Sequence, residues 1–428
     1  TLSASSAASD VYKRQYSTYE STHDITPLDG PKVMILGGGP NRIGQGIEFD
    51  YCCVQAVYGL REAGYKSIMV NCNPETVSTD FDLADRLYFE PITFEDIMNI
   101  IEFEKPDGVL VQFGGQTPLK IAEQLTNEGV KIFGTSSASI DLAENREEFA
   151  RIIKKLKIQI PEYCIAKNYE EIINFSEIAQ FPVLVRPSYV LGGRAMQIVY
   201  NKEQLVDYVF RSAEATNDHP ILIDQFIENA FEFDVDALCD GEEVFIAGIM
   251  QHIEEAGVHS GDSSCVLPPY DMSNKVKEDI IDMTTKLALE LNVVGLINLQ
   301  FAVKNNEVYV LEVNPRSSRT VPFVSKYSNV PIANIAAQLS VGKKIRDFNL
   351  KENHFKHTAV KKAVLPFKKF KDEKVFLGPE MKSTGEVMGI DTEPGIAFLK
   401  AMQSDGYSVP RTGTAFVSIT AVSYTHLR

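Results

Sequence analysis

The sequence predicts a fold of class α/β and α+β: a doubly wound domain on a parallel sheet over about residues 31–140, then a mixed domain ending near Val341. Two observations support this division. Short apolar strands alternate with helices from Lys32 onward, which is typical of a parallel sheet. Beyond about residue 180, strands follow one another through short loops instead. No apolar run approaches the roughly 18 residues that cross a bilayer, so no membrane segment is expected.

The first domain begins with a strand at Val33–Leu36, a glycine turn at residues 37–44 and a helix over Tyr51–Ala63. The loops that follow parallel strands meet at the carboxyl edge of a sheet, where ligands bind. Asn73–Thr76 and Gly114–Thr117 are therefore expected beside the glycine turn. The remaining elements expected in this domain are strands at Ser67–Asn71, Gly108–Gln112 and Lys131–Gly134, a helix at Phe94–Phe103 and a helix ending at Glu128.

The glycine turn matches neither familiar nucleotide-binding pattern. A dinucleotide fingerprint needs a glycine where Arg42 stands and an acid where Asn71 stands, which argues against a dehydrogenase. A P-loop needs a lysine where Gln45 stands. The glycines still permit close backbone approach to a ligand, and the next helix attracts anions at its N-terminus. A substrate-facing loop and a tight structural turn both fit these residues.

A charged helix over Asp141–Leu156 leads into the second domain. There, Tyr189–Arg194 is a glycine-containing loop between two strands, with Arg186 and Arg194 at its flanks. The loop suits closure over phosphates, although an ordinary hairpin tip has the same form. The other expected elements are a strand at 181–188, a strand at Met196–Tyr200, paired strands at Ile221–Ile227 and Glu232–Leu238, a strand at Glu243–Met250 and a helix at Ile332–Ala337.

The strand Val308–Arg316, with the sequence VYVLEVNPR, carries the most chemistry. Glu312, Asn314 and Arg316 are two residues apart, so their side chains share one face. A carboxylate, an amide oxygen and a guanidinium suit Mg²⁺ and phosphate, because Mg²⁺ takes oxygen ligands from one or two carboxylates and from substrate phosphates. An edge strand with a solvated polar face is the alternative.

The preceding strand, Leu296–Val303, is expected to form a hairpin with it and offers Gln300 as a third ligand. A two-residue turn at Asn305–Asn306 would leave Gln300 and Glu312 on opposite faces, whereas a three-residue loop would place them directly opposite each other. A shared metal therefore requires the longer loop or a β-bulge.

Composition indicates a globular protein of two or three domains, with 428 residues, 44% hydrophobic and 23% charged. The net charge of −16 argues against a nucleic-acid surface, so a bound nucleotide needs local cations. Six scattered cysteines without C-x-x-C spacing predict reduced thiols in a cytosolic protein and argue against a zinc site. The candidate cations are Arg146, Arg186, Arg194, Arg316 and Arg319.

Five long motifs stand out: Gly37–Asp50 (GGGPNRIGQGIEFD), Asn71–Thr79 (NCNPETVST), Arg186–Arg194 (RPSYVLGGR), Gly257–Asp262 (GVHSGD) and Glu312–Arg316 (EVNPR). Together they resemble the large subunit of carbamoyl phosphate synthetase, in its second, carbamate-phosphorylating half. The resemblance runs from about Tyr16 to about Gln403. It implies a doubly wound pre-ATP-grasp domain followed by a two-lobed ATP-grasp domain that clamps ATP.

The resemblance also implies roles for single residues. Gln300, Glu312 and Asn314 would hold Mg²⁺ or Mn²⁺, while Arg316 and Arg319, as catalytic residues, would face the transferring phosphate and the carbamate. The implied ATP-binding residues, with the two glycines as a lid, are Arg146, Arg186, Gly192, Gly193, Gln225, Ile227, Glu232, Gly257, Val258, His259, Ser260, Gln300 and Glu312. A core histidine is the alternative reading of His259.

The implied reaction is MgATP plus carbamate giving ADP and carbamoyl phosphate, in the cytoplasm, for arginine and pyrimidine biosynthesis. Expected partners are a first synthetase half, a glutamine amidotransferase small subunit and further copies of the protein, with no nucleic acid and no membrane. Another ATP-grasp ligase of biotin carboxylase type and a non-catalytic nucleotide-binding module are the alternatives. The presence of Gln300, Glu312 and Asn314 argues against the non-catalytic module.

The expected domain limits follow from the same resemblance. Residues 1–30 would hold a non-native leader and the tail of a preceding helical domain, and residues 411–428 the truncated start of an allosteric domain with a non-native tail. The pre-ATP-grasp domain would span 31–140, the ATP-grasp domain 141–345 and the remainder of the carbamoyl phosphate unit 346–410.

Overall fold

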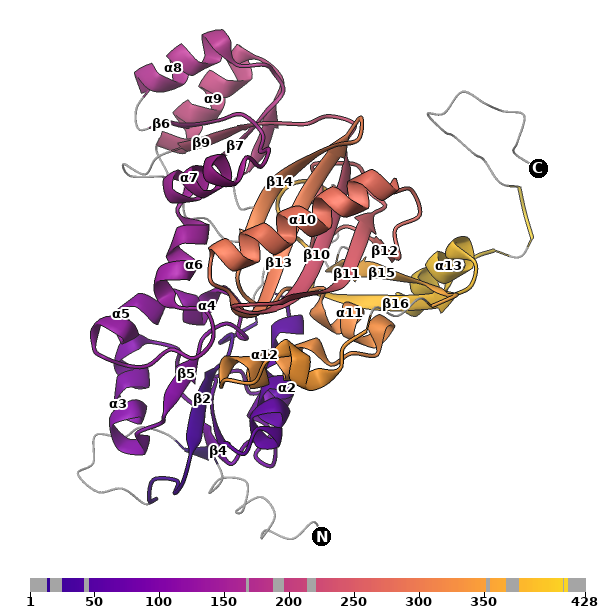
Figure 1. The fold of residues 1–428 in the computed structure, drawn as a ribbon. Coiled ribbons are helices and arrows are strands. Elements are labelled where there is room, and N and C mark those ends of the chain that lie inside the picture. Colours follow the sequence, from indigo (N-terminus) through magenta and orange to yellow (C-terminus); the bar gives the residue numbers. More distant parts are fainter. Residues whose placement is uncertain are drawn as a thin grey trace.

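The computed structural model describes residues 14–15, 25–41, 46–166, 169–187, 196–213, 221–351, 355–366, 377–410 and 412–414. The expected lid residues Gly192 and Gly193 lie outside them, as do Arg42, Gln45 and Arg194. Three sheets organise the described residues (Figure 1). Within these ranges, no helix combines the length and the apolar character needed to cross a membrane.

The first sheet is parallel throughout, and helices cover both of its faces. Val33 and Ile35 pack with α2 (Glu48–Glu62) on one face, whereas Met34 and Leu36 pack with α3 (Phe94–Glu104) on the other. This is the doubly wound arrangement predicted from the sequence. The strand order is β1 (Arg14–Gln15), β4 (Arg86–Tyr88), β3 (Lys66–Val70), β2 (Lys32–Leu36), β5 (Gly108–Leu110), and the other helical elements are η1 (Val77–Thr79), α4 (Gln116–Leu119), α5 (Ala122–Asn127) and α6 (Ser137–Glu144).

Several elements of this domain differ from the prediction. Lys131–Gly134 is not a strand, since only Ile132 forms a single parallel bridge, to Val109. Glycines with positive φ at positions 129 and 134 bracket the segment and leave it too short for more. The strand β4 was not predicted, because three residues carry no periodic signal. Residues 14–15, which were expected to lie outside the fold, pair with β4 as β1.

The charged helix expected over Asp141–Leu156 is two helices, α6 and α7 (Arg146–Leu156). Asn145 separates them because its backbone is extended, with φ −76° and ψ 110°. Its side-chain oxygen accepts from the backbone N–H groups of Glu147 and Glu148, which caps α7. The cap fixes where Arg146 enters the second domain.

The second domain has two lobes, each built on its own sheet (Figure 1). The small antiparallel sheet has the order β6 (Tyr163–Ala166), β9 (Ile221–Gln225), β7 (Val183–Pro187), β8 (Gln197–Val199), with helices α8 (Tyr169–Ile178) and α9 (Lys202–Ala213). The large sheet has the order β14 (Glu307–Asn314), β13 (Val294–Lys304), β10 (Phe231–Asp240), β11 (Val244–His252), β12 (Cys265–Leu267), β15 (Thr358–Val364), β16 (Gly385–Asp391).

The predicted pairing of Ile221–Ile227 with Glu232–Leu238 is wrong. β9 lies between β6 and β7 in the small sheet, and β10 lies between β11 and β13 in the large one. The residues between them carry the chain from one lobe to the other instead of folding back as a hairpin. Asn229, at φ 56°, adopts the left-handed conformation within this connection.

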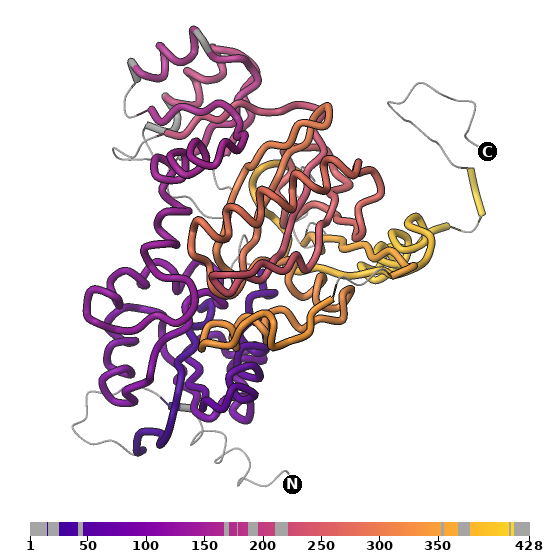
Figure 2. Tube along the Cα trace, viewed as in Figure 1, coloured from indigo at the N-terminus to yellow at the C-terminus, as the bar shows by residue number. Residues whose placement is uncertain are grey.

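The large sheet has one apolar face and one polar face. Phe233 and Val235 of β10 pack under α10 (Asn274–Glu290), so the alternate residues of β10 point to the opposite face. The remaining helical elements are α11 (Val321–Ser328), α12 (Ile332–Ser340), η2 (Ile345–Phe348) and α13 (Pro394–Ser404). α12 lies along α2 of the first domain and closes the core between the two domains (Figure 2).

A β-bulge sets the register of the β13–β14 hairpin. Asn305 and Asn306 form a two-residue turn, both with positive φ, and pair Lys304 with Glu307. Between the pairs 301–310 and 300–312 the register shifts by one residue, so Gln300 lies directly opposite Glu312. The condition set by the sequence, a longer loop or a bulge, is met by the bulge.

Candidate functional site

The expected metal ligands come together on the polar face of the large sheet. Gln300 on β13 lies opposite Glu312, and Asn314 follows two residues later on β14. Gln300 Nε2 donates to Ser260 Oγ at 2.8 Å, which leaves the amide oxygen of Gln300 available to a cation. The Glu312 side chain is exposed, whereas Gln300 and Asn314 are half-buried. One carboxylate and two amide oxygens form an oxygen-only set, which fits Mg²⁺.

The two expected catalytic arginines follow β14 and are anchored to the first domain. Arg316 donates from Nη2 to Asn314 Oδ1 and from Nε to Gln116 Oε1, both at 3.1 Å. Arg319 donates from Nε and Nη2 to the two carboxylate oxygens of Glu48, each at 3.0 Å. Gln116 begins α4, within the expected loop 114–117, and Glu48 begins α2, shortly after the glycine turn. The site is therefore assembled from both domains.

The pKa values of the two arginines shift in opposite directions. Burial lowers the pKa of Arg316. Burial also acts to lower the pKa of Arg319, but the paired carboxylate of Glu48 outweighs it and raises that pKa. Gly46 permits this close pairing, since a Cβ there would lie 2.0 Å from Glu48 Oε2 and 2.3 Å from Arg319 Nε. Both guanidiniums carry their charge at neutral pH and can face a phosphoryl group.

Asn71 holds the glycine turn beside these residues. Its Oδ1 accepts from the Gly39 backbone N–H at 3.0 Å, and its Nδ2 donates to Ser78 Oγ at 3.0 Å. The residue that argues against dinucleotide binding thus ties two loops of the carboxyl edge together. A narrow pocket lies there, lined by the glycine turn, the N-terminus of α2, Asn73 and Thr76.

The two arginines expected to bind phosphate converge on one acid that the sequence analysis missed. Arg146 Nη2 lies 2.5 Å from Asp224 Oδ1, and Arg186 Nη2 lies 3.5 Å from Asp224 Oδ2. Asp224 is buried on β9. The Nε atoms of both arginines are buried and lack a hydrogen-bond partner among the described residues. Two convergent guanidiniums with unused donors fit a polyphosphate.

The other residues of the expected ATP set lie at the junction of the lobes and in the loop after β11. Gln225 ends β9, and Ile227 lies in the connection to the large sheet. Glu232 Oε1 accepts from the backbone N–H of Gly257, at 3.2 Å, which joins β10 to that loop. Within the loop, which also contains Val258, His259 Nδ1 accepts from the Gly261 N–H at 3.0 Å, and burial lowers the pKa of His259.

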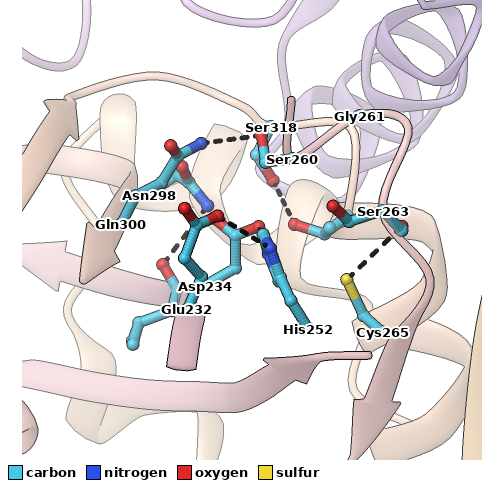
Figure 3. A network of polar contacts seen from close by, with 12 residues as sticks. Glu232, Asp234, His252, Ser260, Gly261, Ser263, Cys265, Asn298, Gln300 and Ser318 are labelled. Carbon is cyan, nitrogen blue, oxygen red and sulfur yellow. Dashed lines mark hydrogen bonds and ion pairs between the residues drawn. The ribbon is translucent and has the colours of Figure 1, made fainter. Parts of the chain in front are cut away.

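A buried cluster of titratable residues lies next to this loop (Figure 3). His252 Nε2 is 2.9 Å from Asp234 Oδ2, its Nδ1 is 3.2 Å from Glu232 Oε2, and Cys265 completes the cluster. Burial acts to lower the pKa of His252, but Cys265, Asp234 and Glu232 together raise it well above its usual value. In the structure the cluster joins His252 to two carboxylates, and the sequence analysis missed it.

The register reveals a second polar row that was also missed. Asp236 on β10 pairs with Asn298 on β13, and Asn298 pairs with Asn314 on β14. The sequence signal was present, because FEFDVDALCD alternates acids with apolar residues at a period of two. This alternation places Glu232, Asp234 and Asp236 on the face that carries the expected cation ligands Gln300, Glu312 and Asn314.

Comparisons with known proteins place these features in context. The family profile "Carbamoyl phosphate synthase preATP-grasp domain" matches residues 29–142, and "Carbamoyl-phosphate synthase L chain, ATP binding domain" matches residues 145–348. The chain is 60% identical over 405 residues to the carbamoyl phosphate synthase large chain of Archaeoglobus fulgidus, and 56% identical over 405 residues to that of Pasteurella multocida. Each alignment covers 94% of this chain, which spans 38% of the length of these relatives.

A shorter relative is matched over most of its length. It is the carbamoyl phosphate synthase large chain, C-terminal section, of Aquifex aeolicus, 55% identical over 91% of this chain and 75% of the relative.

Solved structures share the fold at low identity. The biotin carboxylase domain of Hydrogenobacter thermophilus 2-oxoglutarate carboxylase, in complex with MgADP and bicarbonate, matches with a TM-score of 0.64 at 17% identity, over 79% of this chain and 76% of that one. An ADP complex of N5-carboxyaminoimidazole ribonucleotide synthetase matches with a TM-score of 0.65 at 16% identity, over 89% and 97%. These likenesses concern the fold alone, and the fold-class prediction is confirmed.

Proposed function

We propose that this chain, which belongs to the carbamoyl phosphate synthase large-chain family, transfers the γ-phosphate of ATP to carbamate. The observation that carries the proposal is the arrangement on the large sheet. Gln300 and Glu312 lie opposite each other, and Arg316 and Arg319 follow directly in the next loop. An oxygen-only cation row beside two charged guanidiniums matches the needs of phosphoryl transfer, which are positioning and charge stabilisation.

The cation expected here is Mg²⁺, with Mn²⁺ as the alternative, and Gln300, Glu312 and Asn314 would hold it. When bound, it neutralises charge on the β- and γ-phosphoryl oxygens. Arg146 and Arg186 bind phosphate oxygens through the donors that Asp224 leaves unused. The nucleotide itself is assigned to the lobe junction and the loop after β11, with Gly192 and Gly193 as the lid.

In the reaction, a carbamate oxygen attacks the γ-phosphorus while the bond to the β–γ bridging oxygen breaks, and ADP leaves. Carbamate is already an anion, so no residue needs to remove a proton from it. This agrees with the lowered pKa of His259, whose Nδ1 is used within its own loop. Arg316 and Arg319 face the charge that gathers on the transferring group.

The context of the reaction belongs to the same proposal. The chain would act in the cytoplasm as the second synthetase half, supplied with carbamate by a first half and a glutamine amidotransferase small subunit. Carbamoyl phosphate would feed arginine and pyrimidine biosynthesis, in an oligomeric native protein. The functional unit would comprise residues 31–140, 141–345 and 346–410, between the two terminal segments.

The test is ATP formation from MgADP and carbamoyl phosphate by the purified chain. We expect activity in the parent and its loss in Glu312→Ala. Glu307→Ala is the matched control. Glu307 is exposed on the same strand as Glu312, but it lies beside the turn of the hairpin, away from the site. Circular dichroism verifies folding of each variant. A folded parent that binds MgADP but forms no ATP contradicts the proposal, and biotin carboxylation in its place would favour the alternative ligase.

A further inference from the structure

The loop between β14 and α11, residues 315–320, presents its side chains to different parts of the molecule; we call it the arginine loop. Arg316 and Arg319 reach the site and the first domain, as described above. Ser317 Oγ donates to the carbonyl oxygens of residues 112 and 113, at 3.0 and 3.1 Å. Ser318 and Thr320 instead turn beneath the loop, toward β10. The loop is thus held from two sides, and the second side involves no residue assigned above to catalysis.

The group that holds Ser318 and Thr320 is the carboxyl of Asp236. Ser318 Oγ donates to Asp236 Oδ1 at 2.7 Å, and Thr320 Oγ1 donates to Asp236 Oδ2 at 2.6 Å. Asn298 Nδ2 donates to the same Oδ1 at 2.9 Å. Asn298 and Ser318 both belong to the polar network in Figure 3. Asn298 is also the direct strand neighbour of Asn314, one of the proposed cation ligands.

Asp236 therefore connects the arginine loop with the proposed cation ligands, and the relative position of these two parts matters most for phosphoryl transfer. On one side it fixes the loop that carries Arg316 and Arg319. On the other it binds the strand that carries Gln300. Asp236 is 1% exposed and all three of its donors are neutral, so the link is built from buried hydrogen bonds. A displacement of about 1 Å between the arginines and the cation row is enough to cost about 10²-fold in rate.

The number of protons available to Asp236, Ser318 and Thr320 determines how these three groups bond to one another. The oxygens of Ser318 and Thr320 are also 2.8 Å apart, so three contacts join the two hydroxyls and the carboxyl. Two hydroxyl protons serve only two of these contacts. When Asp236 is ionised, both hydroxyls donate to its carboxylate and the contact between Ser318 and Thr320 carries no proton. When Asp236 is protonated, a third proton closes a ring in which Asp236 donates to Thr320, Thr320 to Ser318, and Ser318 back to Asp236. An asparagine at this position supplies that proton from Nδ2 with nearly the same shape.

We propose that Asp236 is a positioning residue for phosphoryl transfer, which holds the arginine loop in register with the cation row through hydrogen bonds to Ser318, Thr320 and Asn298. This inference rests on the proposed function for its catalytic consequence, but the loop anchoring itself is independent of the substrate. The hydrogen bonds of Asp236 described above go to Ser318, Thr320 and Asn298, none of which is assigned to the nucleotide or the cation. Its removal should therefore affect the rate constant and the local order of the loop far more than nucleotide binding.

The experiment compares Asp236→Ala, Asp236→Asn and Thr320→Val with the parent chain. Thr284→Val is the matched control for Thr320→Val, because Thr284 is fully buried on α10 and its hydroxyl has no hydrogen-bond partner among the described residues. The first readout is kcat for ATP formation from carbamoyl phosphate, with the Kd of MgADP measured separately. The second is hydrogen–deuterium exchange of the peptide that covers residues 315–320, where the Ser317 amide is bonded to the carbonyl of Gln112 at 3.0 Å.

We expect Asp236→Ala to lower kcat by about tenfold or more with the MgADP Kd changed by less than about threefold. Exchange in the loop peptide should accelerate by about tenfold, with exchange in α10 unchanged. Thr320→Val should show a smaller effect in the same direction, and Asp236→Asn should rescue both readouts. Unchanged loop exchange in Asp236→Ala overturns the inference. An inactive parent whose loop exchange still depends on Asp236 refutes the proposed function and leaves the anchoring intact.

Discussion

Replacing Asp236 with asparagine should stabilise the protein, by an amount that depends on pH. Burial outweighs the hydrogen bonds from Thr320, Ser318 and Asn298 and raises the pKa of Asp236 from 3.8 to about 6. A carboxyl with a higher pKa in the folded state holds a proton that the unfolded chain has released. Its contribution to stability therefore declines as the pH rises from about 4 to about 6. Asparagine keeps the ring of hydrogen bonds and never ionises.

The difference between the two pKa values sets the magnitude. It corresponds to about 3 kcal/mol in the free energy of unfolding once the pH exceeds 6, and to about half of that at pH 5. A stability change of 1 kcal/mol shifts the melting temperature by about 2–4 °C in a domain of 150–250 residues. If the ATP-grasp domain melts as one unit, Asp236→Asn should therefore melt about 6–12 °C above the parent at pH 8.

The assay is thermal unfolding followed by circular dichroism at pH 5 and pH 8, with urea unfolding as a second measure. Asp240→Asn is the control with the opposite sign. Burial acts to raise the pKa of Asp240 as well, but backbone N–H groups of residues 242, 243 and 345 outweigh it and lower that pKa, so the ionised form of Asp240 is the stabilising one. An Asp236→Asn variant that melts at or below the parent temperature at pH 8 would refute the reasoning, because the ionised carboxyl would then be the preferred form.

Three further predictions concern the site. Arg319→Lys loses the two-point pairing with Glu48 and should lower kcat/KM for ATP formation by about 10²-fold, measured beside unchanged circular dichroism. Asp224→Asn frees Arg146 and Arg186 from their shared anion and should lower the KM of MgADP by about tenfold with little change in kcat; a pure kcat effect would contradict their proposed role in phosphate binding. Deleting Leu311 removes the bulge but leaves Glu312 directly opposite Gln300, because Glu312 then takes the ladder position after Val310, so ATP formation should persist; its loss in a folded variant would contradict this register.

The fold was predictable where a local pattern carries the information. β2 is buried at all five residues because helices cover both faces of its sheet, and a short apolar run beside a glycine turn reveals such a strand. The sequence near a strand carries no comparable signal for which other strand it pairs with. The apolar character of β9 and β10 locates both strands correctly, but nothing local indicates that five residues between them cross from one lobe to the other.

The site was predictable to the same degree. The spacing of Glu312, Asn314 and Arg316 on one strand identifies a polar face, but the partner across the hairpin depends on Leu311, an extra residue that only continues the apolar run before it. The role of Asp224 could not be predicted from the sequence, for a different reason. Its role appears only when arginines 40 positions apart in the chain, at 146 and 186, meet on one carboxylate.

The anchoring of Arg316 and Arg319 to the first domain has a consequence for cooperativity. A ligand that draws these guanidiniums away from Gln116 or Glu48 loosens the contact between the domains, and a ligand that fits them in place tightens it. Substrate occupancy and domain association are then linked quantities, each changing the other by the same free energy. The two domains have separate sheets and separate family profiles, yet the proposed phosphate site is also a contact that joins them.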